Sequence, residues 1–343
     1  KGIIIMKKFL TLLLVSVLML SALVSCGENG PLYDYNYDEY LTLGTYKGVE
    51  LKTEKIQEEY DKQIDTILTN NAKDEETKKP AVDTNRITFG LSATVGGVEA
   101  SALAKKSVTI VLGTGTTGYK EIDTALVGMS TGETKEVTLV VPAGKTGKAE
   151  IDGKEAVFKI SVTAVTENVK PQTLTDEMVK KATSEEYKTV AEYTEYLRTA
   201  IRQNLAWEAA VSKTTFIKYP KREAEMYYDN YLSSYQATAS QYGMTLESLA
   251  SIYGMTLDSL QNSLAKQAVD QANQDMALLA IAQKESIVPD EAKIAEVKAE
   301  MMKYYGYKTE AELLAVADED SIRRSATYDL VLEFIEKNAV EVK

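Results

Sequence analysis

The chain has 343 residues, of which 51 are acidic and 39 are basic, so its formal net charge at pH 7 is -12. It has no histidine and one cysteine, Cys26, which excludes histidine-dependent catalytic triads, zinc sites built from histidine and cysteine, and disulfide bonds within the chain. The acidic charge predicts no binding to nucleic acid, and we expect no metal and no cofactor. The length is sufficient for two domains with buried cores.

Residues 1–25 have the pattern of a secretory signal peptide. The basic residues Lys7 and Lys8 precede an apolar run from Phe9 to Val24. The last residues, Leu23-Val24-Ser25-Cys26, resemble a bacterial lipobox, which implies that Cys26 carries a lipid once residues 1–25 are removed. We therefore expect a lipid-anchored protein on the extracytoplasmic face of a bacterial cell membrane. A plain secretory signal and an uncleaved membrane anchor are the alternatives.

Residues 26–48 mix turn formers, acids and tyrosines without a periodic apolar face. This composition predicts a flexible tether between the lipid and the folded body. Fully extended, the tether would reach about 75 to 80 Å. The alternative is that its tyrosines form a binding tail.

Residues 49–82 are expected to form a linker strand and helix that pack on the C-terminal helical region. The strand is short, from Lys47 to Leu51, and the helix extends from Thr53 to Thr69 with its apolar residues on one face. Charged residues and a proline follow from Asn70 to Thr84. They predict a linker without regular structure.

The pattern changes period twice in the rest of the chain. Residues 83–166 contain short β-branched runs separated by glycine-rich turns, which predicts a small antiparallel sheet wrapped on one helix. The predicted strands cover residues 86–94, 107–112, 135–141 and 156–165, and the helix covers 119–127. Residues 167–343 have the 3.6-residue period of helices. The helices predicted there cover residues 189–216, 221–242, 245–253, 257–286, 290–305 and 311–338. Strands and helices in separate blocks predict an α+β fold.

Four motifs in this order resemble the trigger factor family. Tyr40 to Val49 resembles the beginning of its middle region, and Leu112 to Glu133 resembles the stretch of its FKBP-type domain that ends in a Gly-Met-x-x-Gly-Glu turn. Gly153 to Ile160 resembles the last strand of that domain, and Leu174 to Val179 resembles the opening of the C-terminal region. The resemblance implies a small FKBP-like antiparallel sheet domain, residues 83–166, inserted in an elongated all-α chaperone domain, residues 167–343. The family's ribosome-docking signature has no counterpart, so we expect no ribosome binding.

The resemblance also implies a prolyl isomerase pocket in the sheet domain. The corresponding apolar residues are Leu91, Tyr119, Ile122 and Phe158. Prolyl isomerisation requires no acid, base or metal, because an apolar pocket that desolvates the amide and favours its twisted state lowers the barrier. The pocket departs from the family's pattern, since an aspartate, the Pro-Gly turn and several aromatics are missing. Two alternatives follow: a degenerate but active pocket, or ordinary core residues of a small barrel.

Tyr227, Tyr231 and Tyr235 recur every four residues and therefore lie along one face of a predicted helix. Tyrosine has a large apolar body and a polar tip, which suits a surface that holds unfolded segments in water. We predict that this stripe binds clients. The alternative is that it is a packed seam between helices.

Together these features predict a membrane-anchored protein-folding factor that binds unfolded or nascent secreted polypeptides and has prolyl isomerase activity. A holdase chaperone with an inactive sheet domain is the first alternative. A solute-binding lipoprotein is a more distant one, because that class would alternate strands and helices along the chain.

Overall fold

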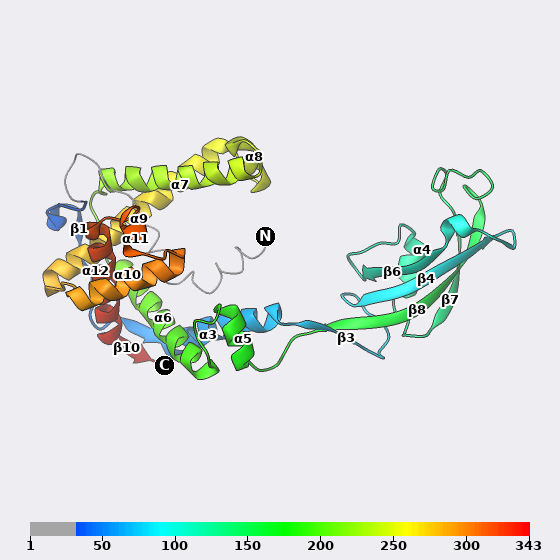
Figure 1. The fold of residues 1–343 in the computed structure, drawn as a ribbon, viewed down its shortest axis with the longest axis horizontal. Coiled ribbons are helices and arrows are strands. Elements are labelled where there is room, and N and C mark those ends of the chain that lie inside the picture. The colour runs from blue at the N-terminus through cyan, green and yellow to red at the C-terminus, as the bar shows by residue number, and fades with distance from the viewer. Residues whose placement is uncertain (1–31) are drawn as a thin grey trace. The chain divides into compact units, whose positions relative to one another are not determined.

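A computed structural model describes residues 32–343 (Figure 1). Residues 1–31 lie outside the described part, and with them lie the predicted signal peptide, Cys26 and the first part of the predicted tether. The fold is α+β, as the sequence predicts, and divides into two compact units. The sheet unit is Asp65–Leu174, and the helical unit comprises the residues up to Ile64 together with Thr175–Lys343.

The sheet unit is an antiparallel sheet with one short α-helix. Its elements are β3 (Lys73–Glu76), β4 (Arg86–Val95), β5 (Val98–Glu99), the 3-10 helix η3 (Ser101–Leu103), β6 (Lys105–Val111), α4 (Lys120–Leu126), β7 (Thr134–Val140) and β8 (Glu155–Val169). The long strand β8 pairs with β4, β7 and β3, and β4 also pairs with β5 and β6. Along β8 the buried residues Ala156, Phe158, Ile160 and Val162 alternate with more accessible ones, as expected for a strand with one face on a core. The strands and helix predicted between residues 86 and 165 are confirmed to within a few residues.

Strand β3 lies where the sequence predicts an irregular linker, and that prediction is wrong. All of its residues are exposed, so it has no apolar alternation by which a strand could be recognised. It forms because it pairs with the end of β8, with Asp74 opposite Asn168, and because Arg86 Nε lies 3.0 Å from Asp74 Oδ2. The sheet unit is consequently larger than the predicted 83–166 domain.

The helical unit is formed by helices that pack on one another. Its elements are the first part of α3 (Thr53–Asn70), α5 (Asp176–Ala182), α6 (Val190–Val211), α7 (Lys221–Gln241), α8 (Leu246–Ile252), α9 (Leu257–Glu285), α10 (Glu291–Tyr305), α11 (Glu310–Leu314) and α12 (Glu319–Lys337). Side-chain caps set several starts: Thr189 and Glu192 form a reciprocal capping box on α6, and Asp290 accepts the Lys293 N–H on α10. The single helix predicted over residues 311–338 is wrong. The chain turns between α11, which ends at Leu314, and α12, whose N-cap is Asp318. Leu313 and Ala317, at this turn, are buried.

Two small strand pairs connect the N-terminal part of the chain to this unit. Antiparallel β1 (Leu41–Thr42) pairs with β9 (Thr215–Phe216), and parallel β2 (Glu50–Lys52) pairs with β10 (Val340–Val342). A 3-10 helix, η2 (Tyr37–Glu39), precedes β1. The described part of the predicted tether, residues 32–48, is therefore not a free tether. Tyr33, Leu41 and Tyr46 are buried against the helical unit, a result of contacts with residues far away in the sequence.

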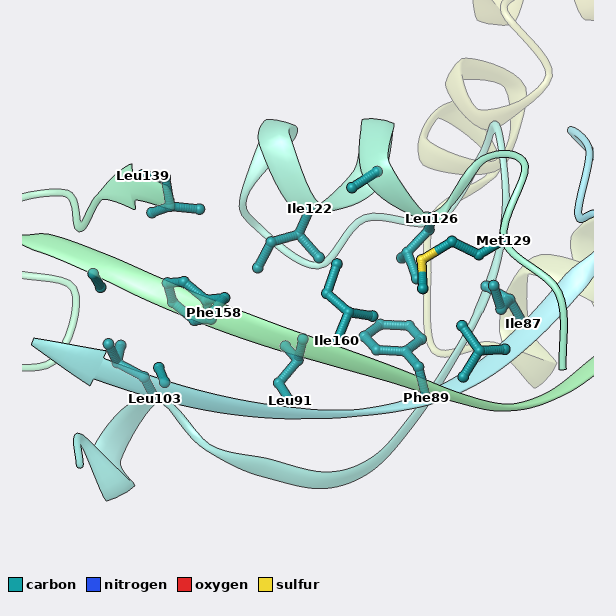
Figure 2. Packing of buried hydrophobic residues seen from close by; sticks show 14 of the residues in the cluster. Ile87, Phe89, Leu91, Leu103, Ile122, Leu126, Met129, Leu139, Phe158 and Ile160 are labelled. Carbon is teal, nitrogen blue, oxygen red and sulfur yellow. The ribbon is translucent and has the colours of Figure 1, made fainter. Parts of the chain in front are cut away.

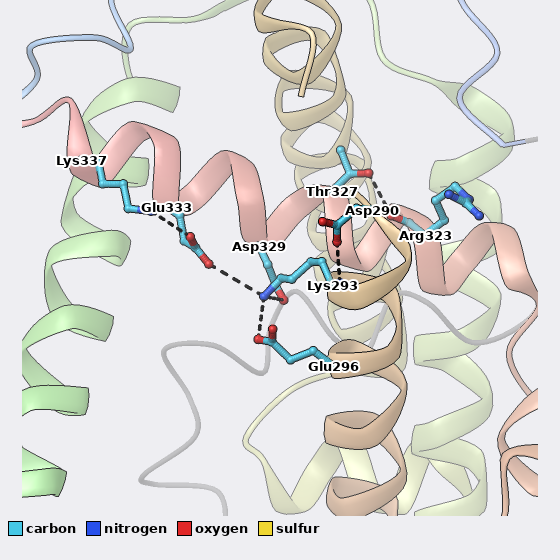
Figure 3. Close-up of polar contacts among 8 residues, drawn as sticks. All are labelled: Asp290, Lys293, Glu296, Arg323, Thr327, Asp329, Glu333 and Lys337. Carbon is cyan, nitrogen blue, oxygen red and sulfur yellow. Dashed lines mark hydrogen bonds and ion pairs between the residues drawn. The ribbon is translucent and has the colours of Figure 1, made fainter. Parts of the chain in front are cut away.

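A cluster of charges joins α10 to α12 (Figure 3). The ammonium of Lys293 lies 3.0 Å from Glu296, 3.3 Å from Asp329 and 3.8 Å from Glu333. Burial raises the pKa of the Asp329 carboxyl to about 6, although Lys293 acts to lower it. The cluster thus couples the packing of two helices to a group that titrates near neutral pH.

Candidate functional site

The predicted prolyl pocket lies in the core of the sheet unit (Figure 2). Leu91 comes from β4, Ile122 from α4 and Phe158 from β8, and these side chains meet in one apolar cluster. Ile122 and Phe158 have no exposed surface, and Leu91 is buried as well. The structure therefore brings these three residues together, but as part of the core, which is the alternative that the sequence leaves open.

Tyr119 differs from the other three residues because it is only half-buried. It precedes α4, and its ring centroid lies 5.2 Å from that of Phe158. The ammonium of Lys145 lies 5.2 Å from the centroid of the Tyr119 ring, within the range of a cation–π interaction. Burial, and then the Asp152 charge, raise the pKa of the Tyr119 phenol, so it stays a hydrogen-bond donor at neutral pH. Of the four predicted residues, Tyr119 is the most accessible, and its catalytic role stays a prediction.

The predicted client-binding stripe runs along α7. Tyr227 is fully buried against α9, and its phenol donates a hydrogen bond to Asp275. The packed seam between α7 and α9 covers the Tyr227 ring, as in the alternative that the sequence leaves open, and the contact of Tyr227 with clients stays a prediction. Tyr231 and Tyr235 are half-buried and pack beside Leu260 and Leu264. They retain some accessible surface.

Large apolar side chains are exposed at the C-terminal ends of α7 and α8. Tyr242, Ile252 and Tyr253 are exposed by 61%, 66% and 58%. We call these three residues the hairpin surface. Monomeric soluble proteins rarely leave a cluster of large apolar side chains exposed unless it binds something.

A repeated motif produces this surface. Tyr242-Gly243-Met244-Thr245-Leu246 recurs as Tyr253-Gly254-Met255-Thr256-Leu257, and each copy ends one helix and starts the next. The glycines have φ of 65° and 71°, the left-handed conformation of a helix C-cap, and each following methionine N–H donates back to the helix at 3.0 Å. The threonines cap the next helices. Each tyrosine is left at the helix end, facing water, and the duplication in the sequence is the signal by which this surface could have been found.

Other site types have less support in the described residues. Between residues 32 and 343 no group of three or more acidic, cysteine or histidine side chains is arranged to hold a metal ion. Within the same residues no helix has the length and apolar character needed to cross a bilayer. A cavity of about 170 Å³ lies between α3 and α6, away from the predicted site residues, and is lined by Glu59, Ile201, Asn204, Leu205 and Glu208.

Comparison with known proteins gives a consistent relationship. Residues 175–337 match the family model described as "Bacterial trigger factor protein (TF) C-terminus". The chain is 24% identical over 322 residues to the trigger factor of Pediococcus pentosaceus and 26% identical over 313 residues to that of Staphylococcus aureus, with 87% of this chain and 71% of each relative covered. A solved structure described as "Promiscuous Substrate Recognition in Folding and Assembly Activities of the Trigger Factor Chaperone" aligns at 16% identity with a TM-score of 0.32, covering 87% of this chain and 73% of that one.

The chain is an α+β protein with a sheet unit inserted in a helical unit, and it has exposed apolar side chains on the helical unit. The chain is trigger factor-like, with a trigger factor C-terminal domain in residues 175–337. This likeness supports a function in protein folding through the binding of unfolded polypeptides.

Proposed function

We propose that this protein is a holding chaperone that binds unfolded segments through the hairpin surface of its helical unit. The observation that carries the proposal is the exposure of Tyr242, Ile252 and Tyr253 within twelve residues of one another. Each large apolar side chain that a client covers contributes about 1.5 to 3 kcal/mol, so three of them are enough for weak, reversible capture. The tyrosines also keep a polar tip for water when no client is bound.

Suppression of aggregation tests this function. The full chain should lose at least about tenfold in apparent affinity for an unfolded client when Tyr242, Ile252 and Tyr253 are all changed to serine. The matched control changes Val98 and Val140 to serine, because these side chains are exposed by 71% and 62% in the sheet unit. If the triple variant and the control suppress aggregation of the client equally well, the hairpin surface is not the client-binding site.

We also propose that the chaperone is attached to the outer face of a bacterial cell membrane through a lipid on Cys26 and acts there on secreted clients, without docking to the ribosome. The support is the sequence: Lys7 and Lys8, the apolar run that follows, and the lipobox-like Leu23 to Cys26. A Cys26→Ala variant should keep its signal peptide and carry no lipid by mass spectrometry. If the parent protein carries no lipid by mass spectrometry, this part of the proposal fails and the chaperone function is unaffected.

Prolyl isomerisation is the second candidate activity, in a sheet unit that we propose to be FKBP-like. The observation that favours it is the half-buried ring of Tyr119 at the border of the core, beside Phe158. Proline-limited refolding should be accelerated by the parent protein and not by Tyr119→Ala, whereas Tyr304→Ala, a change on α10, should act like the parent. No acceleration by the parent protein would leave a holdase with an inactive sheet unit.

A further inference from the structure

The N-terminal residues 33–40, here called the tyrosine segment, occupy a polar site on the helical unit. Tyr33 is only 3% exposed. Its backbone N–H donates to Glu223 Oε1 at 2.9 Å, and its phenol donates to Asp275 Oδ2 at 3.0 Å. The phenol of Tyr35 donates to the second oxygen of Glu223 at 2.8 Å. Two carboxylates thus recognise one backbone amide and two phenols that are two residues apart.

The site is made of side chains that are themselves buried. Glu223 on α7 and Asp275 on α9 have no exposed surface, and Gln271 Nε2 donates to Asp275 Oδ1 at 2.8 Å. The guanidinium carbon of Arg324, on α12, lies 5.9 Å from the ring centroid of Tyr33. A buried carboxylate is costly unless donors surround it, so the bonds from the tyrosine segment satisfy groups that the helices alone leave short of partners.

Further contacts extend the bound segment toward β1. Tyr37 donates from its phenol to the Tyr33 carbonyl at 3.2 Å, and the rings of Tyr35 and Tyr40 lie 4.7 Å apart. Lys218 lies 3.1 Å from Glu39 and 4.1 Å from the Tyr40 ring centroid. Tyr33 itself has φ of 61°, a left-handed conformation that an aromatic residue adopts only when its surroundings impose it. The segment is therefore held by specific contacts along its length.

We propose that this is a peptide-binding site for a segment with alternating tyrosines, that its resident ligand is the tyrosine segment, and that its occupancy sets the distance between the helical unit and Cys26. With the segment bound, the first fixed residue is Tyr33, seven residues after Cys26, so the connection between them reaches at most about 25 Å. With the segment released, the connection reaches about 50 to 54 Å, because the chain is then free to Leu41, where β1 pairs with β9. The bound segment shortens the reach about twofold.

This inference rests on the proposed lipid at Cys26 for its biological meaning. A chaperone held within about 25 Å of the membrane would meet secreted chains as they leave the bilayer, whereas a released one would explore a much larger volume. The same segment would then act as both ligand and length control.

The sole cysteine and the sole tryptophan allow a direct test that does not depend on cellular lipidation. A chain that begins at Cys26 keeps every contact described above, and its thiol can be coupled to a maleimide lipid in vesicles that also carry a dansyl headgroup lipid. Trp207 is buried in the helical unit, where its indole N–H donates to Gln274 at 3.1 Å, so energy transfer from Trp207 to dansyl reports the distance of that unit from the bilayer.

The parent chain should show strong transfer, and Tyr33→Ala/Tyr35→Ala should show weaker transfer because its reach grows about twofold. Tyr33→Phe/Tyr35→Phe removes only the two hydroxyls and should give an intermediate value. Tyr304→Ala should match the parent. A Gly/Ser insert of about ten residues after Gly30 lengthens the connection without touching the site and should lower the transfer as well.

A second measurement tests the site without a membrane. The Tyr33 amide should exchange its hydrogen slowly in the parent chain and at least about a hundredfold faster in Tyr35→Ala, as the buried bond to Glu223 opens. Rapid exchange of this amide in the parent chain, or transfer equal to that of Tyr33→Ala/Tyr35→Ala, would overturn the inference. Absence of lipid on Cys26 in cells would instead count against the membrane proposal alone, because the coupled vesicles supply the attachment.

Discussion

Replacement of Lys293 by methionine removes the only cation that lies within 4 Å of Asp329 in the described residues and keeps the length of the side chain. The Lys293 side chain is 13% exposed and that of Asp329 is 26% exposed, so the pair lies between a surface pair and a buried one. Exposed pairs contribute up to about 1 kcal/mol, and loss of one partner of a buried pair costs about 3 to 5 kcal/mol. We expect Lys293→Met to lower the free energy of unfolding by about 2 kcal/mol at pH 8.

The loss should depend on pH, with a sign that follows from Asp329. Its pKa is about 6 in the folded chain, above the usual 3.8, so the protonated carboxyl is favoured by folding. This contribution is fully present below about pH 4 and is lost as the pH rises through about 6. At pH 5 Asp329 is largely protonated and needs its cation less. We therefore expect Lys293→Met to cost less than about 1 kcal/mol at pH 5.

Urea unfolding at pH 5 and pH 8, followed by the fluorescence of Trp207, measures both values. Lys303→Met is the matched control, because Lys303 pairs with Glu186 at 3.0 Å with side chains 65% and 40% exposed, and should cost less than about 0.5 kcal/mol. The double variant Lys293→Met/Asp329→Leu should recover most of the loss, since it also removes the most buried of the carboxyls that Lys293 neutralises. Equal losses at the two pH values, or no recovery in the double variant, would refute this reasoning.

Three further substitutions have expected effects. Phe158→Ala should destabilise the sheet unit by about 3 to 5 kcal/mol, measured by thermal unfolding of its β-sheet circular dichroism, so loss of isomerase activity in this variant would report unfolding and not catalysis. Gly44→Ala places a Cβ 2.1 Å from the Lys213 carbonyl oxygen, and should expose the N-terminal segment to limited proteolysis while Thr45→Ala does not. Gly243→Ala forces a side chain on a residue with φ of 65°, and should lower the urea midpoint by an amount equivalent to about 1 kcal/mol; an unchanged midpoint would contradict the helix-cap assignment.

The strands and helices that bury one face in a core were predictable because their apolar residues recur with the period of a strand or a helix. Strand β8 alternates apolar and polar residues around Phe158 and Ile160, and α7 and α9 repeat theirs every three or four residues. The glycines and threonines of the repeated motif also specify local geometry, since each acts within one helical turn. These features depend on residues that are close together in the chain, so they can be predicted from the sequence.

The sequence by itself determined the α+β class, the order of the sheet and helical regions, and the likeness to trigger factor, because these follow from local periods and from motifs in a fixed order. Only the tertiary structure decided which apolar side chains are accessible: Phe158 and Tyr227 are buried, whereas Tyr242 and Tyr253 face water. It also decided that Tyr33 is bound and not free, since its partners Glu223 and Asp275 lie 190 and 242 residues away. Burial and long-range pairing depend on which elements meet, and no local pattern encodes that meeting.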